Sequence, residues 1–198
     1  MSIDNGSLRV FGVDLLKKHI SLVRVIVLAA TAGWIVLTAL FFPVEGDTRS
    51  ISAPRKGFTA PDFILNISGS ESTRLSQYRG QVVLINFWAT WCLPCRQEMP
   101  AIQAIFDEYR SEGLVVLAVD ALNDSPTDVA AFAYENDLSF TILFDPDGRI
   151  VWQYAVQALP TTFFVDRKGV IRNVVIGGPM SEEFLRLQIM DLLDDEVD

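Results

Sequence analysis

Residues 91–96 read Trp-Cys-Leu-Pro-Cys-Arg, and Cys92 and Cys95 are the only cysteines in the chain. Two cysteines separated by two residues can close a disulfide and open it again by thiol exchange. A purely structural bridge is disfavoured, because closing so short a loop adds only roughly 2 kcal/mol of stability. A metal site would need a histidine or a third cysteine to complete it. The pair therefore predicts thiol chemistry.

The distribution of histidine excludes several other chemistries. The single histidine, His19, lies near the N-terminus, so residues 58–198 contain none. Zinc or copper sites with histidine ligands, Ser-His and Cys-His nucleophile pairs and imidazole acid–base catalysis are excluded from that part of the chain. We expect no metal and no cofactor beyond a redox-active Cys92–Cys95 disulfide.

The net charge of the chain is −9, and it is spread unevenly. Residues 1–24 carry four basic and two acidic side chains, whereas residues 43–198 carry 12 basic and 23 acidic ones. Nucleic acids and anionic lipid surfaces bind positive potential, so the acidic part argues against both as partners. A solvated surface that keeps the protein soluble explains this charge, and attraction of a basic protein partner is the alternative.

Residues 25–42 contain no charged side chain. As a helix they would span about 27 Å, close to the roughly 30 Å hydrocarbon core of a bilayer. A cleaved signal peptide would have a shorter apolar region followed by small residues, but this run ends in Leu-Phe-Phe-Pro. We therefore expect an uncleaved transmembrane anchor. Lys17, Lys18 and Arg24 precede it and Arg49 follows it, which places the N-terminus in the cytoplasm.

The expected organisation has four parts, which are a cytoplasmic segment over 1–24, the anchor over 25–42, a linker over 43–57 and a folded domain over 58–198. The linker is polar, with two prolines and two glycines. As a flexible chain it would span on the order of 20 Å, which would let the domain meet partners on or in the membrane.

Strand and helix patterns alternate through the domain. We expect strands over 63–67, 72–75, 82–88, 114–120, 141–144, 162–165 and 170–176, and helices over 94–112, 126–136 and 181–193. The runs at 82–88 and 114–120 are continuously apolar, as in strands covered on both faces. This order predicts an α/β sandwich with a mixed sheet. The cysteine pair falls just after a buried strand, at the start of a helix.

The position at a helix start assigns different roles to the two cysteines. The nucleophile in thiol exchange is the thiolate, and a free cysteine with a pKa near ~8.5 is mostly protonated at neutral pH. Unpaired N–H groups at a helix N-terminus stabilise an anion. Cys92 sits where this field is strongest and is the expected nucleophile. Cys95 lies one turn into the helix, where it would attack the mixed disulfide and release the product.

These features resemble the thioredoxin superfamily and, within it, the membrane-anchored TlpA/ResA-type thiol:disulfide reductases. The matching text is NFWATWCLPCRQEMP at 86–100, APDFIL at 60–65 and ALPTTFFVDRKG at 158–169. The order of elements from about 58 to 193 also follows that family. The resemblance implies a thioredoxin-like sandwich with a mixed central sheet and an N-terminal hairpin, preceded by one transmembrane helix.

The resemblance also implies roles for residues outside the cysteine pair. Pro160 matches the cis-proline that faces the redox pair, whereas the simpler interpretation is a trans proline in a turn. Leu159 would offer its backbone to an extended substrate segment, and Trp91 would cover the site.

Glu98 matches the active-site glutamate of the family and lies three residues after Cys95, on the same helix face. It could take a proton from Cys95 or raise the cysteine pKa values, and a solvated surface glutamate is the alternative. Asn86 stands where cytosolic-type thioredoxins have a buried aspartate.

The leading hypothesis is a membrane-tethered enzyme that reduces protein disulfides outside the cytoplasm. The resemblance implies electrons from a membrane electron-transfer protein, and targets in cytochrome c or oxidase maturation. A disulfide oxidase or isomerase is the second hypothesis, although Leu93-Pro94 supplies no polar residue between the cysteines. A thiol peroxidase would need a Thr-x-x-Cys site, and a copper chaperone of the Sco kind would need a distal histidine, and neither is present.

Overall fold

The computed structural model describes residues 24, 26–31, 33–34, 52–67, 71–122 and 124–194. The chain divides into two units, residues 1–48 and residues 49–198. Among the residues that the structure describes, no helix has the length and apolar character needed to span a bilayer. Most of the anchor expected over 25–42 lies outside the described residues.

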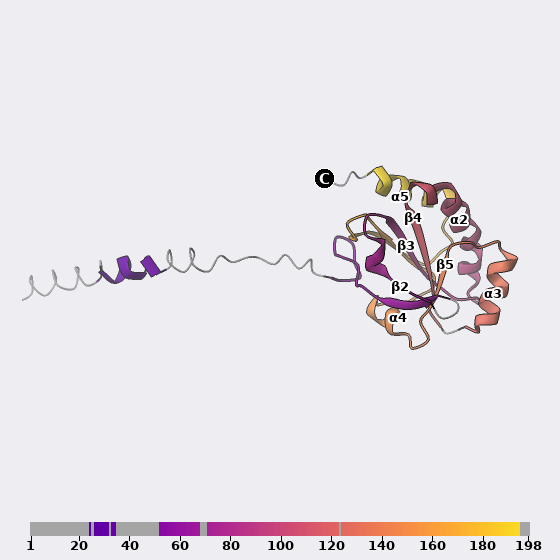
Figure 1. The fold of residues 1–198 in the computed structure, drawn as a ribbon, viewed down its shortest axis with the longest axis horizontal. Coiled ribbons are helices and arrows are strands. Elements are labelled where there is room, and N and C mark those ends of the chain that lie inside the picture. Colours follow the sequence, from indigo (N-terminus) through magenta and orange to yellow (C-terminus); the bar gives the residue numbers. More distant parts are fainter. Residues whose placement is uncertain are drawn as a thin grey trace, which may run out of the picture. The chain divides into compact units, whose positions relative to one another are not determined.

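The second unit is built on a seven-stranded mixed sheet (Figure 1), in the order β2-β1-β5-β4-β3-β6-β7. Its strands are β1 (Ile64–Ile67), β2 (Ser72–Arg74), β3 (Val82–Trp88), β4 (Leu114–Asp120), β5 (Thr141–Phe144), β6 (Thr161–Val165) and β7 (Ile171–Ile176). The β3–β4 and β4–β5 pairs are parallel, and the other neighbours are antiparallel. The predicted mixed sheet and N-terminal hairpin are confirmed.

The centre of the sheet is formed by β3 and β4, whose residues pair in register from Val82 with Leu114 to Trp88 with Asp120. All seven residues of β3 are buried. A strand covered on both faces reads as a continuous apolar run, which is why the sequence VVLINFW occupies this position. Asn86 is the one polar residue in the run, and it is fully buried.

Helices cover both faces of the sheet. They are α2 (Leu93–Tyr109), α3 (Pro126–Glu135), α4 (Arg149–Gln153) and α5 (Glu182–Asp194), with short 3₁₀ turns over Leu75–Tyr78 and Arg110–Glu112. Apolar residues of α2, α3 and α5 form one core cluster with Leu84 and Trp88 of β3. Ile150 of α4 belongs to a second cluster, with Ile85 and Phe87. Side chains alternate along a strand, so β3 contributes to both cores.

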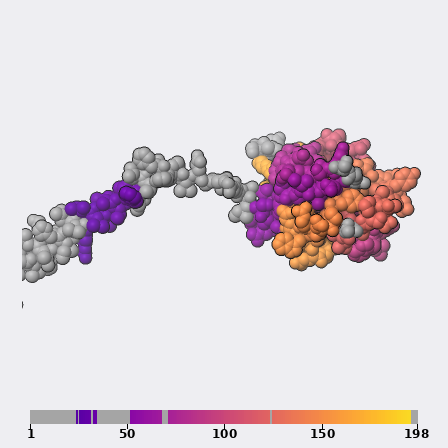
Figure 2. Space-filling model, turned by 60° about the horizontal axis from the view of Figure 1, so that its bottom comes forward, coloured from indigo at the N-terminus to yellow at the C-terminus, as the bar shows by residue number. Residues whose placement is uncertain are grey.

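The N-terminal part of the domain is tied to α4. The Tyr154 hydroxyl donates to the Pro61 carbonyl at 2.7 Å, and Gln153 Nε2 donates to the Asp62 carbonyl at 3.2 Å. Figure 2 shows this face, where the purple N-terminal region of the domain lies beside the orange segment that contains α4. These bonds tie the segment before β1 to the α4 side of the sheet, which is opposite α2.

Two details differ from the sequence-based expectation. The helix α4 was not predicted, because its five residues are too few to display a helical period. Part of the expected linker is bonded to the domain, since the Gly57 N–H donates to the Ile171 carbonyl at 2.7 Å. Gly57, at the end of the expected linker, is therefore bonded to β7.

Candidate active site

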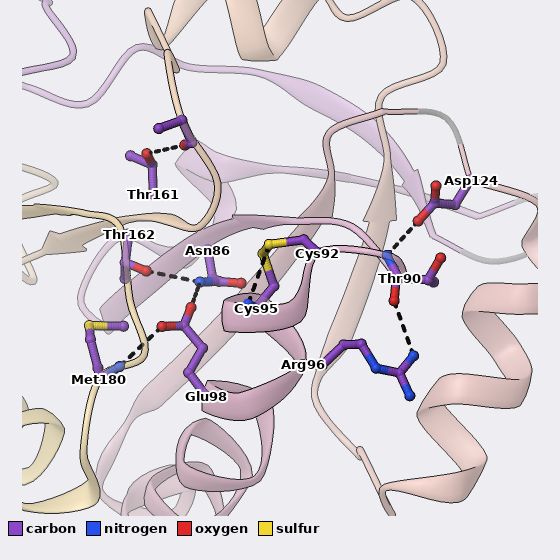
Figure 3. Close-up of a disulfide and its surroundings, with 11 residues drawn as sticks. Asn86, Thr90, Cys92, Cys95, Arg96, Glu98, Asp124, Thr161, Thr162 and Met180 are labelled. Atoms are coloured by element: carbon purple, nitrogen blue, oxygen red, sulfur yellow. Dashed lines mark hydrogen bonds between the residues drawn. A yellow bond between two sulfur atoms is a disulfide. The ribbon is translucent and has the colours of Figure 1, made fainter.

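Cys92 and Cys95 form a disulfide at the first turn of α2 (Figure 3). Cys92 is the N-cap residue, and its sulfur accepts a hydrogen bond from the Cys95 backbone N–H at 3.3 Å. Pro94 occupies the first turn, where its missing N–H leaves no helical bond unmade. Cys92 is 5 % exposed and Cys95 is fully buried. An incoming thiol or disulfide therefore reaches Cys92 first.

The loop before Cys92 is held from both sides. The Thr90 N–H donates to Asp124 Oδ2 at 2.6 Å, and Arg96 Nη1 donates to the Thr90 carbonyl at 3.0 Å. The Arg96 guanidinium lies over the Phe132 ring, 4.7 Å from its centroid. Asp120, at the end of β4, accepts from the Asp124 N–H at 2.8 Å. Burial raises the pKa of the Asp120 carboxyl, and the neighbouring Asp124 carboxylate adds to this effect.

The loop before β6 carries a cis peptide bond between Leu159 and Pro160. The Thr161 hydroxyl donates to the Ala158 carbonyl at 2.7 Å, and the Gly177 N–H donates to the Pro160 carbonyl at 2.7 Å. These bonds fix the loop to the start of β6 and the end of β7. The loop forms one wall of the groove beside Cys92, because Leu159 and Cys92 line the same pocket.

Glu98 is fully buried one turn after Cys95. Its Oε1 accepts from Asn86 Nδ2 at 2.8 Å, and its Oε2 accepts from the Met180 N–H at 3.3 Å. Asn86 Nδ2 also donates to Thr162 Oγ1 at 2.9 Å. Burial raises the pKa of Glu98 to about 7, although the hydrogen bonds from Asn86 and Met180 act to lower it. Glu98 is therefore a group that can gain or lose a proton near neutral pH.

Gly178 packs directly against this carboxyl group. A Cβ atom placed on Gly178 would lie 2.6 Å from Glu98 Oε2 and 2.8 Å from Pro160 Cγ. Both separations are shorter than real Cβ contacts allow. The Gly178–Pro179 peptide bond that follows is also cis. The absence of a side chain at Gly178 leaves room for the buried carboxylate and the cis-proline loop to lie side by side.

An apolar groove of about 420 Å³ opens beside Cys92. Its lining comes from three segments, residues 91–94, residues 121–122 and residues 156–159, together with Val151 of α4. Trp91 and Leu93 are each 65 % exposed, and Leu122 is 51 % exposed. Among the described residues, no charged side chain lines this groove. A partner that reaches Cys92 therefore meets an apolar surface.

The structure brings together the residues that the sequence singled out. Cys92, Trp91 and Leu159 line the groove, and Cys95 and Glu98 lie behind it in the protein interior. The alternative of a solvated Glu98 is wrong, because this side chain has no exposed surface. The assignment of catalytic roles to these residues stays a prediction.

Sequence reasoning missed the partners that surround the predicted residues, namely Thr162, Gly178, Met180, Thr90 and Asp124. The Gly-Gly-Pro run at 177–179 marks a turn, but nothing local links it to Glu98. Within the part of the chain that the structure describes, no group of three or more His, Cys, Asp or Glu side chains is placed to hold a metal ion.

Known proteins resemble this chain over most of its length. Residues 57–174 match the model of the AhpC/TSA family. The chain belongs to the AhpC/TSA family. It is 35% identical over 161 residues to the thiol-disulfide oxidoreductase ResA of Geobacillus kaustophilus, which covers 81% of this chain and 88% of the relative. It is also 37% identical over 171 residues to the thioredoxin-like protein YneN of Bacillus subtilis, covering 85% and 95% of the two chains.

Solved structures with a similar fold belong to thiol-disulfide chemistry as well. A protein from Chlorobium tepidum, described as a thiol:disulfide interchange protein DsbE, superposes with a TM-score of 0.65 at 36% identity, over 72% of this chain and 99% of that one. StoA of Bacillus subtilis gives a TM-score of 0.57 at 29% identity, over 65% and 96%. The protein is thus a thioredoxin-like thiol-disulfide oxidoreductase of the ResA/DsbE type, with its redox disulfide at Cys92–Cys95.

Proposed function

We propose that this oxidoreductase reduces disulfides in other proteins, with Cys92 as the nucleophile and Cys95 as the resolving cysteine. The observation that carries the proposal is the unequal placement of the two sulfurs. Cys92 lines an open apolar groove at the start of α2, and Cys95 is sealed beneath it. Similarity to ResA proteins over most of the chain supports thiol exchange as the reaction.

The first step is attack by the Cys92 thiolate on one sulfur of the substrate disulfide. A bond forms between Cys92 and that sulfur, and the other substrate sulfur leaves as a thiolate. The backbone N–H groups at the start of α2 stabilise the attacking thiolate, and one of them, on Cys95, already points at the Cys92 sulfur. A substrate segment bound in the apolar groove would exclude water from the reacting sulfurs.

The second step is attack by Cys95 on the Cys92 sulfur of the mixed disulfide. Cys95 must first lose its proton, and we propose that the Glu98 carboxylate receives it. Both residues are buried on one face of α2, and a pKa of about 7 lets Glu98 hold or release a proton at neutral pH. The second substrate sulfur leaves, so the substrate gains two electrons and Cys92–Cys95 becomes a disulfide.

The proposed substrate contact follows from the groove and the loop before β6. An extended segment on either side of the target cysteine would lay apolar side chains against Trp91 and Leu122, and pair with the backbone of Leu159. Turnover then requires a dithiol donor that reduces the Cys92–Cys95 disulfide again.

We propose further that residues 25–42 anchor the protein in the membrane, with residues 1–24 in the cytoplasm and the domain on the outer side. The absence of charge in 25–42 and the basic residues before it support this orientation. In this setting the electrons come from a membrane protein, and the substrates belong to the maturation of cytochrome c or of an oxidase.

The reduction potential tests the direction of the reaction. We expect a value well below that of strong oxidants, measured by equilibration of the purified domain with glutathione or dithiothreitol. A value near −120 mV, the range of strong disulfide oxidants, would overturn the reductase assignment and favour the oxidase alternative.

Trapping tests the proposed roles and partners. The Cys95→Ser full-length protein, expressed in its native membrane, should accumulate mixed disulfides through Cys92. The Cys92→Ser variant is the matched control and should accumulate none. Accumulation in the control alone would reverse the two roles.

Fractionation tests the proposed anchor. The full chain should stay with the membrane pellet after an alkaline carbonate wash, and a chain without residues 1–42 should be released. A reporter enzyme that is active only outside the cytoplasm should work when it is fused after residue 57. Activity of a cytoplasmic reporter at that position would contradict the orientation.

A further inference from the structure

Asn86 occupies a position on β3 that faces the redox helix. Side chains alternate along a strand, and its neighbours on the same face, Leu84 and Trp88, belong to the core cluster that contains Cys95. Asn86 lies between them and is fully buried. It contacts Glu98, one helical turn beyond Cys95. The asparagine side chain therefore lies on the face of β3 that carries the core around α2.

The orientation of the Asn86 amide follows from its partners. Its nitrogen donates to the Glu98 carboxyl oxygen at 2.8 Å and to the Thr162 hydroxyl oxygen at 2.9 Å. An ionised carboxylate can only accept hydrogen bonds, so the Asn86 nitrogen faces Glu98 whenever Glu98 is ionised. The oxygen is then turned the other way, and Figure 3 shows it directed towards the Cys92–Cys95 pair.

The Asn86 oxygen has no hydrogen-bond partner although it is buried. Within the described residues, the only buried side-chain polar atoms without a partner are Asn86 Oδ1 and Trp88 Nε1. A buried acceptor left unpaired is unfavourable, so an oxygen held in this position calls for an explanation. The structure is that of the disulfide form, in which neither sulfur carries a hydrogen that could be donated.

We propose that Asn86 Oδ1 accepts a hydrogen bond from the Cys95 thiol when the disulfide is reduced. Reduction by a donor dithiol breaks the S–S bond with two electrons, and the donor becomes a disulfide. The released Cys95 sulfur takes up a proton, and its S–H group donates to Asn86 Oδ1. The Cys92 sulfur, at the helix start, stays available as the thiolate.

This hydrogen bond would have two consequences for the reaction. The dithiol form satisfies an acceptor that the disulfide form leaves unpaired, so the bond favours the dithiol form. The bond also keeps the proton on Cys95 rather than on Cys92. Asn86 cannot itself take that proton, but it is bonded to the Glu98 carboxylate that can. Asn86 thus helps to keep the proton on the Cys95 thiol, in addition to positioning Glu98.

Infrared spectroscopy of a single-thiol protein gives the direct test. In the full-length Cys92→Ser variant the only thiol is Cys95, so one S–H stretching band is present. We expect this band to move to higher frequency and lose intensity when Asn86→Leu is added, because the S–H···O bond is lost. An unchanged band would overturn the proposal, even if Asn86 still positions Glu98. Asn86→Val, whose branched side chain suits a strand, is the second variant should the leucine variant not fold.

Two further variants separate the hydrogen bond from general effects on folding. Asn86→Asp keeps the shape and an acceptor oxygen, so its band should stay at the lower frequency. Gln103→Leu makes the same change from buried amide to leucine farther along α2, where Gln103 contacts Ser139. That control should leave the Cys95 band in place.

The redox equilibrium gives a second measurement in the protein with both cysteines. Asn86→Leu should shift the equilibrium with dithiothreitol about tenfold towards the disulfide, the scale expected for one buried hydrogen bond, which corresponds to about 30 mV. Gln103→Leu should shift it much less. The proposal rests on the cycling of Cys92–Cys95 and not on the direction of turnover, so a protein that proves to be an oxidase would leave both measurements valid. A shift of the same size in the control would contradict the proposal.

Discussion

The two sulfur atoms of the disulfide lie in opposite surroundings, although their residues are three positions apart. The Cys92 side faces an open groove lined by Trp91, Leu93 and Leu122, in which none of the described lining residues is charged. The Cys95 side faces a closed polar cluster, in which Asn86 and Glu98 are fully buried. The comparison indicates that the two regions have different roles. Under the proposed mechanism, the outer region receives a partner and the inner region controls a proton.

The largest expected effect concerns the reactivity of the two thiols. In single-cysteine proteins, Cys92 in the Cys95→Ser variant should react with iodoacetamide on the order of a thousandfold faster at neutral pH than Cys95 in the Cys92→Ser variant. Cys92 combines access with a thiolate-stabilising helix start, whereas Cys95 has no exposed surface. Alkylation followed by mass spectrometry measures both rates. Equal rates would remove the distinction between the inner and outer sulfur.

The second prediction concerns the buried carboxyl of the inner region. The pKa of Glu98 is raised from 4.5 to about 7 in the folded protein, so between these values the folded state binds more protons than the unfolded state. The stability of the wild-type protein relative to Glu98→Gln should therefore fall as pH rises from 4.5 to 7, by roughly 3 kcal/mol in total. Urea unfolding of the disulfide form across this range measures the difference.

The control for this pH dependence is the same substitution at the exposed Glu135 of α3. Glu135→Gln makes an identical change in charge without touching the inner cluster. A pH dependence of equal size in both variants would show that burial of Glu98 is not its cause.

The third prediction concerns the space that Gly178 leaves for Glu98. Gly178→Ala should lower the free energy of unfolding by about 2 kcal/mol, because the new methyl group would press on the Glu98 carboxyl and on the Pro160 ring. Urea unfolding at a pH below 4.5 and again above 7 measures the loss. Adding Glu98→Ala should relieve part of it, since one of the two contacts disappears. A double variant that is additive would show that Gly178 and Glu98 do not interact.

The smallest expected effect belongs to the outer region. Leu122→Glu should lower kcat/KM for a protein disulfide substrate about tenfold, or roughly 1.4 kcal/mol, because substrate binding would desolvate the new charge. The stability and the equilibrium with dithiothreitol should change little. Leu187→Glu on α5 is the matched control, since Leu187 is 61 % exposed and does not line the groove. An equal loss in both variants would assign the effect to net charge.

The sequence predicted the main elements of the domain closely. The strands over 82–88, 114–120 and 141–144 have the expected boundaries, and Ser125 caps the helix α3, with its hydroxyl accepting from the Thr127 N–H. These elements were predictable because continuous apolar runs, caps and turn residues are local signals. The redox motif was predictable for the same reason, since strand, cysteine pair and helix start are adjacent in the chain.

The sequence by itself determined that Cys92 begins a helix and that Cys95 and Glu98 share one face of it, because helical spacing depends only on nearby residues. Only the tertiary structure decided that this face is closed. Thr162 reaches Asn86 across 76 residues through the antiparallel pairing of β3 with β6, and the Met180 N–H reaches Glu98 across 82 residues. Such contacts depend on which strands become neighbours, and that choice is made by burial of the whole core rather than by any local pattern.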